Sequence, residues 1–123
     1  MKVVDEKEFK DEINDGLVLV DFFATWCGPC RMMASVLEQA DKEIKNVKII
    51  KVDVDESEDL ARDFGIMSIP TIMLFKDGKE VDSHIGLMSM SDLKKFVENN
   101  KWGLLWTILW ENIMKMIMNL YIT

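Results

Sequence analysis

Residues 17–30 of this 123-residue chain run LVLVDFFATWCGPC. Leu17–Phe23 is apolar on both faces apart from Asp21, a pattern typical of a strand that is buried on both sides. Pro29 follows at a position where proline suits the first turn of a helix. The stretch therefore predicts a buried strand, a short loop that reaches Cys27, and a helix that begins directly after it.

The sequence on either side of this stretch alternates between strand-like and helix-like patterns up to about residue 100. Asp5 and Ser89 are suited to begin helices, Gly65 to end one, and Asp77-Gly78 to turn a hairpin. The other predicted elements are a short strand at Met1–Val4, a helix at Glu6–Asn14, a helix from Pro29 through Ile44, a strand at Val47–Val54, a short helix containing Leu60, Ala61 and Phe64, a hairpin of Thr71–Phe75 and Glu80–Ile85, and a last helix through Val97. This order predicts an α/β fold whose central mixed β-sheet carries helices on both faces.

The bulk composition is that of one globular domain with a strong acidic excess. Apolar residues make up 49% and charged residues 30%, and the formal net charge is −7. An acidic chain without basic clusters repels nucleic acid, which we therefore exclude as a partner. Residues 1–6 hold no apolar signal core, so we expect an intracellular, reducing compartment.

Cys27 and Cys30 are the only cysteines in the chain. A helix that begins after Cys27 brings unpaired N–H groups and the positive end of its dipole near that sulfur, and both favour the thiolate. Cys30 lies one helical turn further on, so the two sulfurs can bridge. Between them, Gly28 lets a partner chain approach closely and Pro29 fixes the turn. The spacing favours a redox-active pair.

Two alternative interpretations of the cysteines are a zinc site and inert buried side chains. A structural zinc ion needs four ligands, but the chain has no second cysteine pair and one histidine, His84. Gly-Pro between two cysteines after a buried strand is not a core pattern. We therefore expect no metal site, and we expect His84 to face solvent without a catalytic role.

The run Val20–Cys30 is similar to the signature of the thioredoxin family. The segment Gly65–Thr71, GIMSIPT, resembles the one that carries the family's cis-proline, and Lys51, Asp77-Gly78 and Gly86 fall at matching positions. The similarity covers about residues 1–100. It implies a thioredoxin fold and the activity of a protein-disulfide oxidoreductase.

The resemblance also implies a role for each residue at the reacting centre. Cys27 attacks a substrate disulfide to form a mixed disulfide, and Cys30 then attacks Cys27 and releases the reduced substrate. Asp21 is the buried carboxylate that takes the proton from Cys30, since burial raises a carboxyl pKa toward that of a useful general base. Lys51 lies near Asp21 and modulates it.

A substrate-binding surface beside the cysteines follows from the same resemblance. Pro70, in the cis form, places Ile69 next to the active site, where the Ile69 backbone pairs with an extended substrate segment. Trp26, Ile69, Ile85 and Gly86 form the apolar docking surface.

The residues between the cysteines indicate the direction of the reaction. Neither Gly28 nor Pro29 ionises, whereas oxidising relatives typically place a histidine there, so we expect a reductant. The resemblance implies a cytoplasmic electron donor to disulfide-containing proteins, with no bound cofactor, that serves redox homeostasis. Its Cys27–Cys30 disulfide would be recharged by a flavin-containing, NADPH-dependent thioredoxin reductase. The alternative is a non-catalytic scaffold or binding subunit of the same fold.

Residues 101–123 differ in composition from the predicted domain of residues 1–100. Positions 102–123 hold 15 apolar side chains among 22 and only two charges, Glu111 and Lys115. Two mid-helix charges cost about 5–7 kcal/mol on the insertion scale, so we do not expect this segment to span a membrane. At 100° per residue it forms an amphipathic helix whose broad apolar face holds Trp102, Trp106, Leu109, Trp110, Ile113, Met116, Ile117 and Leu120.

The sequence leaves the role of this C-terminal helix open. The alternatives are self-association to a homo-oligomer, packing on its own domain, peripheral contact with a membrane, and an appendage without function. A helix that carries three tryptophans could also dock on the apolar rim of the active site and compete with substrate.

Overall fold

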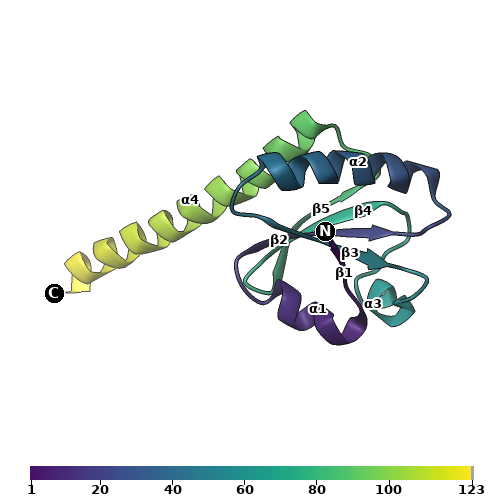
Figure 1. The fold of residues 1–123 in the computed structure, drawn as a ribbon. Coiled ribbons are helices and arrows are strands. Elements are labelled where there is room, and N and C mark those ends of the chain that lie inside the picture. The colour runs from purple at the N-terminus through teal and green to yellow at the C-terminus, as the bar shows by residue number, and fades with distance from the viewer. Residues whose placement is uncertain (123) are drawn as a thin grey trace.

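The computed structural model describes residues 1–122, with the side chains of residues 1–100 and 109–122. Its elements in chain order (Figure 1) are β1 (Lys2–Val3), α1 (Glu6–Ile13), β2 (Leu17–Phe23), α2 (Gly28–Glu43), β3 (Lys48–Asp53), α3 (Glu58–Asp63), β4 (Thr71–Lys76), β5 (Lys79–Ile85) and α4 (Met90–Ile122). The predicted order of strands and helices is confirmed.

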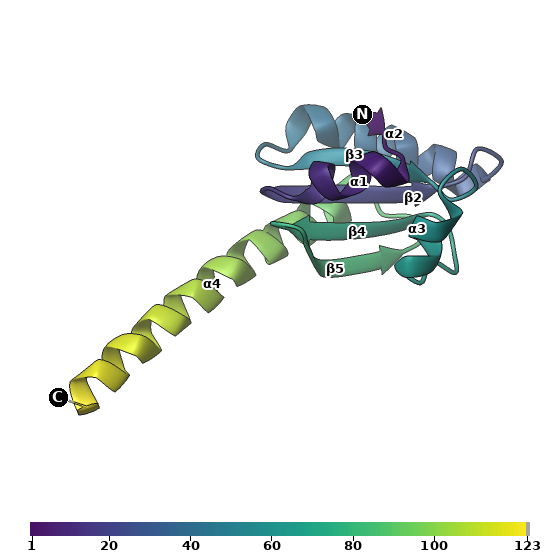
Figure 2. The ribbon, with the colours of Figure 1, turned by 90° about the horizontal axis from the view of Figure 1, so that it is seen from below.

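The strands form one mixed sheet in the order β1-β3-β2-β4-β5 (Figure 2). β1 and β2 pair with β3 in parallel, while β4 pairs antiparallel with both β2 and β5. Asp77 and Gly78 both have positive φ, 49° and 86°, which is the backbone that a tight hairpin between twisted strands requires. β2 thus lies at the centre of the sheet, where its residues are covered from both faces.

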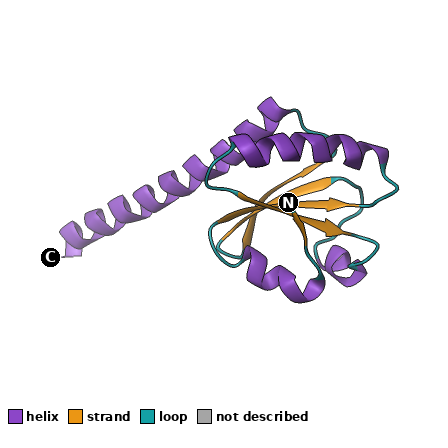
Figure 3. Ribbon diagram, viewed as in Figure 1, coloured by secondary structure: helices purple, strands orange, loops and turns teal. Residues whose placement is uncertain are grey.

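Helices cover both faces of the sheet (Figure 3), α2 and the start of α4 on one and α1 with α3 on the other. Neighbouring residues of β2 point into different cores, because side chains alternate along a strand. Leu19 packs in the cluster that contains Leu37 of α2 and Leu93 of α4. Val20 packs in the cluster that contains Phe9 of α1. The predicted burial of β2 on both faces is confirmed.

The predicted C-terminal helix is present, but it is not a separate element. α4 runs without interruption for 33 residues, from the Ser89 cap, whose Oγ accepts the Asp92 N–H at 3.0 Å, to Ile122. Leu93 and Val97 are buried against the domain. The sequence contains no proline after Pro70, so no proline interrupts the helix at the point where the domain ends.

Beyond the domain, α4 projects away from the sheet, at the end opposite to the start of α2 (Figures 1 and 2). All side chains of residues 109–122 are exposed, so this part does not pack on its own domain or cover the active site in the same chain. Trp102 and Trp106 lie outside the residues whose side chains are described. None of the helices within the described residues combines the length and apolar character needed to cross a bilayer.

Candidate active site

Cys27 and Cys30 lie at the N-terminal end of α2 and form a disulfide. Cys27 is the N-cap residue, with an extended backbone at φ −86° and ψ 114°, and Cys30 lies in the first turn. Their Cα atoms are 5.3 Å apart, within the usual range for a disulfide. Both residues are buried, with exposed fractions of 5% and 3%. The predicted bridging of the two sulfurs is confirmed.

The backbone of α2 sets the electrostatics at Cys27. The Cys30 N–H donates to the Cys27 sulfur at 3.2 Å, which satisfies one of the free N–H groups at the helix start. The positive end of the 16-residue helix dipole lies at the same place. In the reduced pair both effects stabilise a thiolate at Cys27 over a thiol, which makes that sulfur the better nucleophile.

Asp21 is fully buried in the centre of β2. Its side chain lies on the same face as Leu19, the face that α2 covers, and neither carboxylate oxygen has a hydrogen-bond partner among the described residues. Burial raises the pKa of Asp21 to about 6, and the positive charge of Lys51 opposes that rise. A carboxyl group with this pKa exchanges protons near neutral pH, as a general base must.

Lys51 lies beside Asp21 because β2 and β3 pair in parallel. The two residues are direct partners in the ladder. The Lys51 ammonium lies 4.3 Å from the centre of the Phe23 ring, in the geometry of a cation–π contact. Phe23 therefore holds the lysine near the carboxylate without neutralising its charge.

The loop before β4, which carries Ile69 and Pro70, lies against Cys27. The peptide bond between Ile69 and Pro70 is cis, as the family resemblance predicts. The Ile69 carbonyl oxygen lies 3.8 Å from the Cys27 sulfur, and the Pro70 carbonyl accepts the Gly86 N–H at 2.8 Å. Gly86 has φ +97°, a backbone conformation that residues with a Cβ rarely adopt. These contacts bring three predicted substrate-binding residues to one edge of the active site.

Large apolar side chains around this site are exposed to solvent. Trp26 is 68% exposed and Ile85 67% exposed. Met67, which lies in the same loop as Pro70, is 94% exposed. Exposed apolar side chains grouped beside a reactive sulfur are suited to bind the apolar parts of a protein substrate.

Asp55 also belongs to the site, although the sequence analysis missed it. Its carboxylate accepts the Trp26 indole N–H at 2.8 Å. Asp53, which ends β3, holds the turn that carries it, because Asp53 Oδ1 accepts the Asp55 N–H at 2.9 Å. The indole ring is thereby fixed beside Cys27 despite its exposure.

We expect Asp55→Ala to release the Trp26 indole and to raise KM for a disulfide protein such as insulin about twofold, with kcat little changed. The lost hydrogen bond is expected to lower the free energy of unfolding by about 0.5–1 kcal/mol. Steady-state reduction kinetics and urea unfolding measure the two effects. Asp59→Ala, which removes an exposed aspartate paired with Arg62, is the control. An unchanged KM would show that substrate binding does not depend on the hydrogen bond between the Trp26 indole and Asp55.

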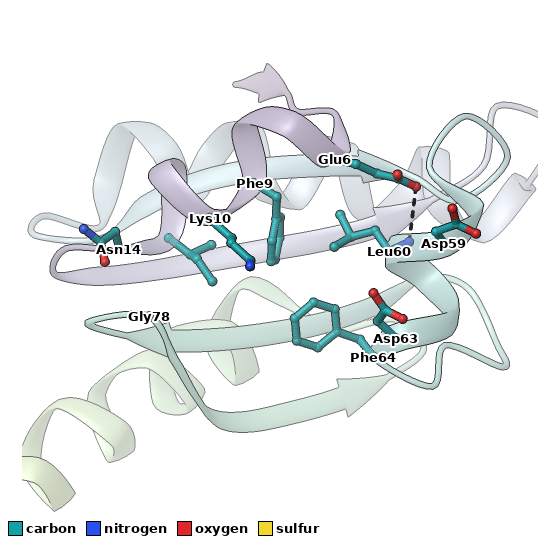
Figure 4. A pocket seen from close by; sticks show the side chains of 10 residues that line it. Glu6, Phe9, Lys10, Asn14, Asp59, Leu60, Asp63, Phe64 and Gly78 are labelled. Atoms are coloured by element: carbon teal, nitrogen blue, oxygen red, sulfur yellow. Dashed lines mark hydrogen bonds between the residues drawn. The ribbon is translucent and has the colours of Figure 1, made fainter.

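A cavity of about 490 Å³ lies away from the cysteines, on the face covered by α1 and α3 (Figure 4). Phe9, Leu60 and Phe64 form its apolar wall, and the Glu6 carboxylate accepts the Leu60 N–H at its edge, at 3.3 Å. None of the predicted site residues lines it. Among the described residues there is also no group of three or more His, Cys, Asp or Glu side chains that could hold a metal ion.

Comparison with known proteins places this geometry in a family. The family profile described as Thioredoxin matches residues 1–99. The chain is 48% identical to a thioredoxin of Chlamydia muridarum over 101 residues, which cover 82% of this chain and 99% of that protein. It is 43% identical to a thioredoxin of Bacillus subtilis over 96 residues, 77% of this chain and 92% of the other.

A solved structure shows the same likeness. A mutant thioredoxin from Halobacterium salinarum superposes with a TM-score of 0.75 at 36% identity, covering 81% of this chain and 88% of that one. The residues after 99 lie outside the match to the family profile.

Proposed function

Since the chain belongs to the thioredoxin family of protein-disulfide oxidoreductases, we propose that its activity uses Cys27 as the attacking thiol and Cys30 as the resolving thiol. The observation that carries this assignment is the position of Cys27 at the start of α2, where the Cys30 N–H points at its sulfur. The scaffold alternative is not favoured, because the redox-active pair is present.

The reaction proceeds in two exchanges that together transfer two electrons. The Cys27 thiolate attacks one sulfur of a substrate disulfide, so that a mixed disulfide forms and the other substrate sulfur leaves as a thiolate. Asp21 takes the proton from Cys30, and the resulting Cys30 thiolate attacks the Cys27 sulfur. The second substrate sulfur leaves, and the Cys27–Cys30 disulfide remains. Lys51 modulates the proton affinity of Asp21, which its charge lowers.

The substrate segment lies along the cis-proline loop. The Ile69 backbone pairs with it, while Trp26, Ile85 and Gly86 provide the apolar docking surface and Gly28 and Pro29 shape the turn between the sulfurs. Three contacts support this, those of Ile69 with Cys27, of Gly86 with Pro70 and of Trp26 with Asp55.

The proposal extends to the direction of the reaction and to its electron source. Neither Gly28 nor Pro29, the two residues between the cysteines, carries a charge that would favour the reduced pair, so the pair donates electrons to disulfide-containing proteins. An NADPH-dependent thioredoxin reductase recharges it. A cytoplasmic location fits a chain in which both cysteines are used by the redox pair.

The resolving role of Cys30 predicts a trapped intermediate. We expect Cys30→Ser, mixed with an oxidised disulfide protein such as insulin, to accumulate a covalent adduct that dithiothreitol releases. The first exchange remains intact while the second has lost its nucleophile. Non-reducing electrophoresis followed by mass spectrometry detects the adduct and locates it at Cys27. Cys27→Ser is the control and should form no comparable adduct, whereas equal trapping by both variants would contradict the assignment.

A further inference from the structure

The outer part of α4 exposes more apolar surface than a soluble monomer usually does. Ten large apolar side chains of residues 109–122 are between 40% and 87% exposed. An apolar side chain of this size carries on the order of 200 Å² of surface, so the six that share one face, Leu109, Trp110, Ile113, Met116, Ile117 and Leu120, together present roughly 700 Å². The largest apolar patch on a typical monomer measures roughly 300–600 Å².

The spacing of these side chains identifies the kind of partner they fit. Leu109, Ile113, Met116 and Leu120 follow one another at intervals of four, three and four residues. This alternation is the a/d repeat of a coiled coil, in which apolar residues recur every 3.5 residues on average and face a second helix. In the sequence the same alternation extends back through Trp106 to Trp102. We call Leu109, Ile113, Met116 and Leu120 the seam.

The charges of this part of α4 lie away from the seam. At 100° per residue Glu111 and Lys115 fall on the side opposite to Ile113, as does Met118. The seam is flanked on one side by Trp110 and Ile117, which widen the apolar stripe. A partner helix can therefore approach the seam without burying a charge.

Other occupants of the seam fit less well. The chain's own domain does not reach it, because all side chains of residues 109–122 are exposed and the helix points away from the sheet (Figure 2). A membrane surface attracts helices whose polar face is rich in Lys and Arg, whereas this helix has Lys115 alone between residues 109 and 122, and the chain carries a net charge of −7.

We propose that the seam of α4 binds the same seam in a second copy of this chain. The apolar repeat of the seam matches the same repeat in a second copy, and the apolar face of roughly 700 Å² that the seam forms with Trp110 and Ile117 is close to the roughly 800 Å² per partner of a standard stable interface. Because the seam lies at the end of the molecule away from the start of α2 (Figure 1), the pairing leaves that end of α2, which carries the cysteines, uncovered. The dimer formed in this way has two open active sites.

Two methionines two residues apart allow a matched test in the full chain. Met116 lies on the seam and Met118 on the opposite side, and they are 66% and 57% exposed. At about 100 µM protein, far above a micromolar Kd, we expect light scattering coupled to gel filtration to give twice the 14.3 kDa chain mass for the wild type. Met116→Lys should give a single chain mass, while Met118→Lys and Met116→Leu should keep the doubled mass.

Three results would overturn the proposal. They are a wild type with a single chain mass, a doubled mass that Met116→Lys leaves intact, and a doubled mass that Met118→Lys abolishes equally. Co-sedimentation with phosphatidylcholine vesicles is measured in parallel, and a single-mass chain that sediments with them assigns the seam to a lipid surface instead. Insulin reduction by each variant, expected to be unchanged, shows that the domain remains folded.

Discussion

Cys27→Ser is expected to lower the rate of insulin reduction, driven by dithiothreitol and corrected for the uncatalysed reaction, on the order of 10³-fold or more. A serine hydroxyl keeps the position and nearly the size of the thiol, but it does not ionise near neutral pH. The N–H of Cys30 and the dipole of α2 then have no anion to stabilise. The loss of rate therefore arises in the chemical step, and it should appear as a lower kcat/KM.

The comparison with Cys30→Ser separates chemistry from folding. Both variants lack the disulfide and both keep a buried side chain of the same size, so their free energies of unfolding should be similar. Only Cys30→Ser retains the attacking sulfur and should therefore be alkylated by iodoacetamide at Cys27. If Cys27→Ser retained a tenth or more of the wild-type rate, Cys27 would not be the attacking thiol.

Asp21→Asn is expected to remove a pH dependence from the stability of the fold. The ordinary pKa of an aspartate is 3.8, and burial raises that of Asp21 to about 6 in the folded chain. As pH rises from 3.8 to about 6, the unfolded state ionises first, and this lowers its free energy relative to that of the folded state. The wild type therefore loses about 3 kcal/mol of stability across this interval and does not recover it at higher pH.

The asparagine variant has no carboxyl group to ionise at this position. We expect its free energy of unfolding, relative to the wild type, to be about 3 kcal/mol greater near pH 8 than near pH 3.5. Burying the asparagine amide also costs free energy, but this cost is the same at both pH values and cancels when the two values are subtracted. Urea unfolding at both pH values measures the difference, and Asp41→Asn, on the exposed side of α2, is the matched control. A difference for Asp21→Asn no larger than a few tenths of a kcal/mol would mean that burial does not raise the pKa of Asp21.

Asp21→Asn should also slow turnover at pH 7, by about tenfold, since Cys30 loses its proton acceptor. A free energy of unfolding that rises with pH relative to the wild type, combined with reduced activity, is what replacing a buried catalytic carboxylate produces. A purely structural aspartate would lower both properties when it is replaced.

Much of the fold followed from local patterns in the sequence. The run of Leu17–Phe23, apolar apart from Asp21, predicted a strand covered on both faces, and Asp5 and Ser89 predicted helix starts that their side chains cap. The extent of α4 did not follow, because a helix that meets neither a proline nor a folded neighbour can continue past the edge of its domain.

The site was predictable only in part. Cys27 and Cys30 are recognisable because their chemistry depends on spacing within one helical turn. Asp55 was missed because its partner Trp26 is 29 residues away in the chain, and an aspartate in an acidic loop resembles an ordinary solvated residue.

The sequence by itself determined the order of strands and helices, the redox pair and the heptad spacing of the C-terminal segment. These depend on neighbours within a few residues, where hydrophobic period, capping and helical spacing act. Only the tertiary structure decided that Asp21 is without a hydrogen-bond partner among the described residues, that Asp55 accepts the indole N–H of Trp26, and that the outer part of α4 is left uncovered. Burial and contact between distant segments arise when the sheet and its helices assemble, and no single stretch of sequence contains them.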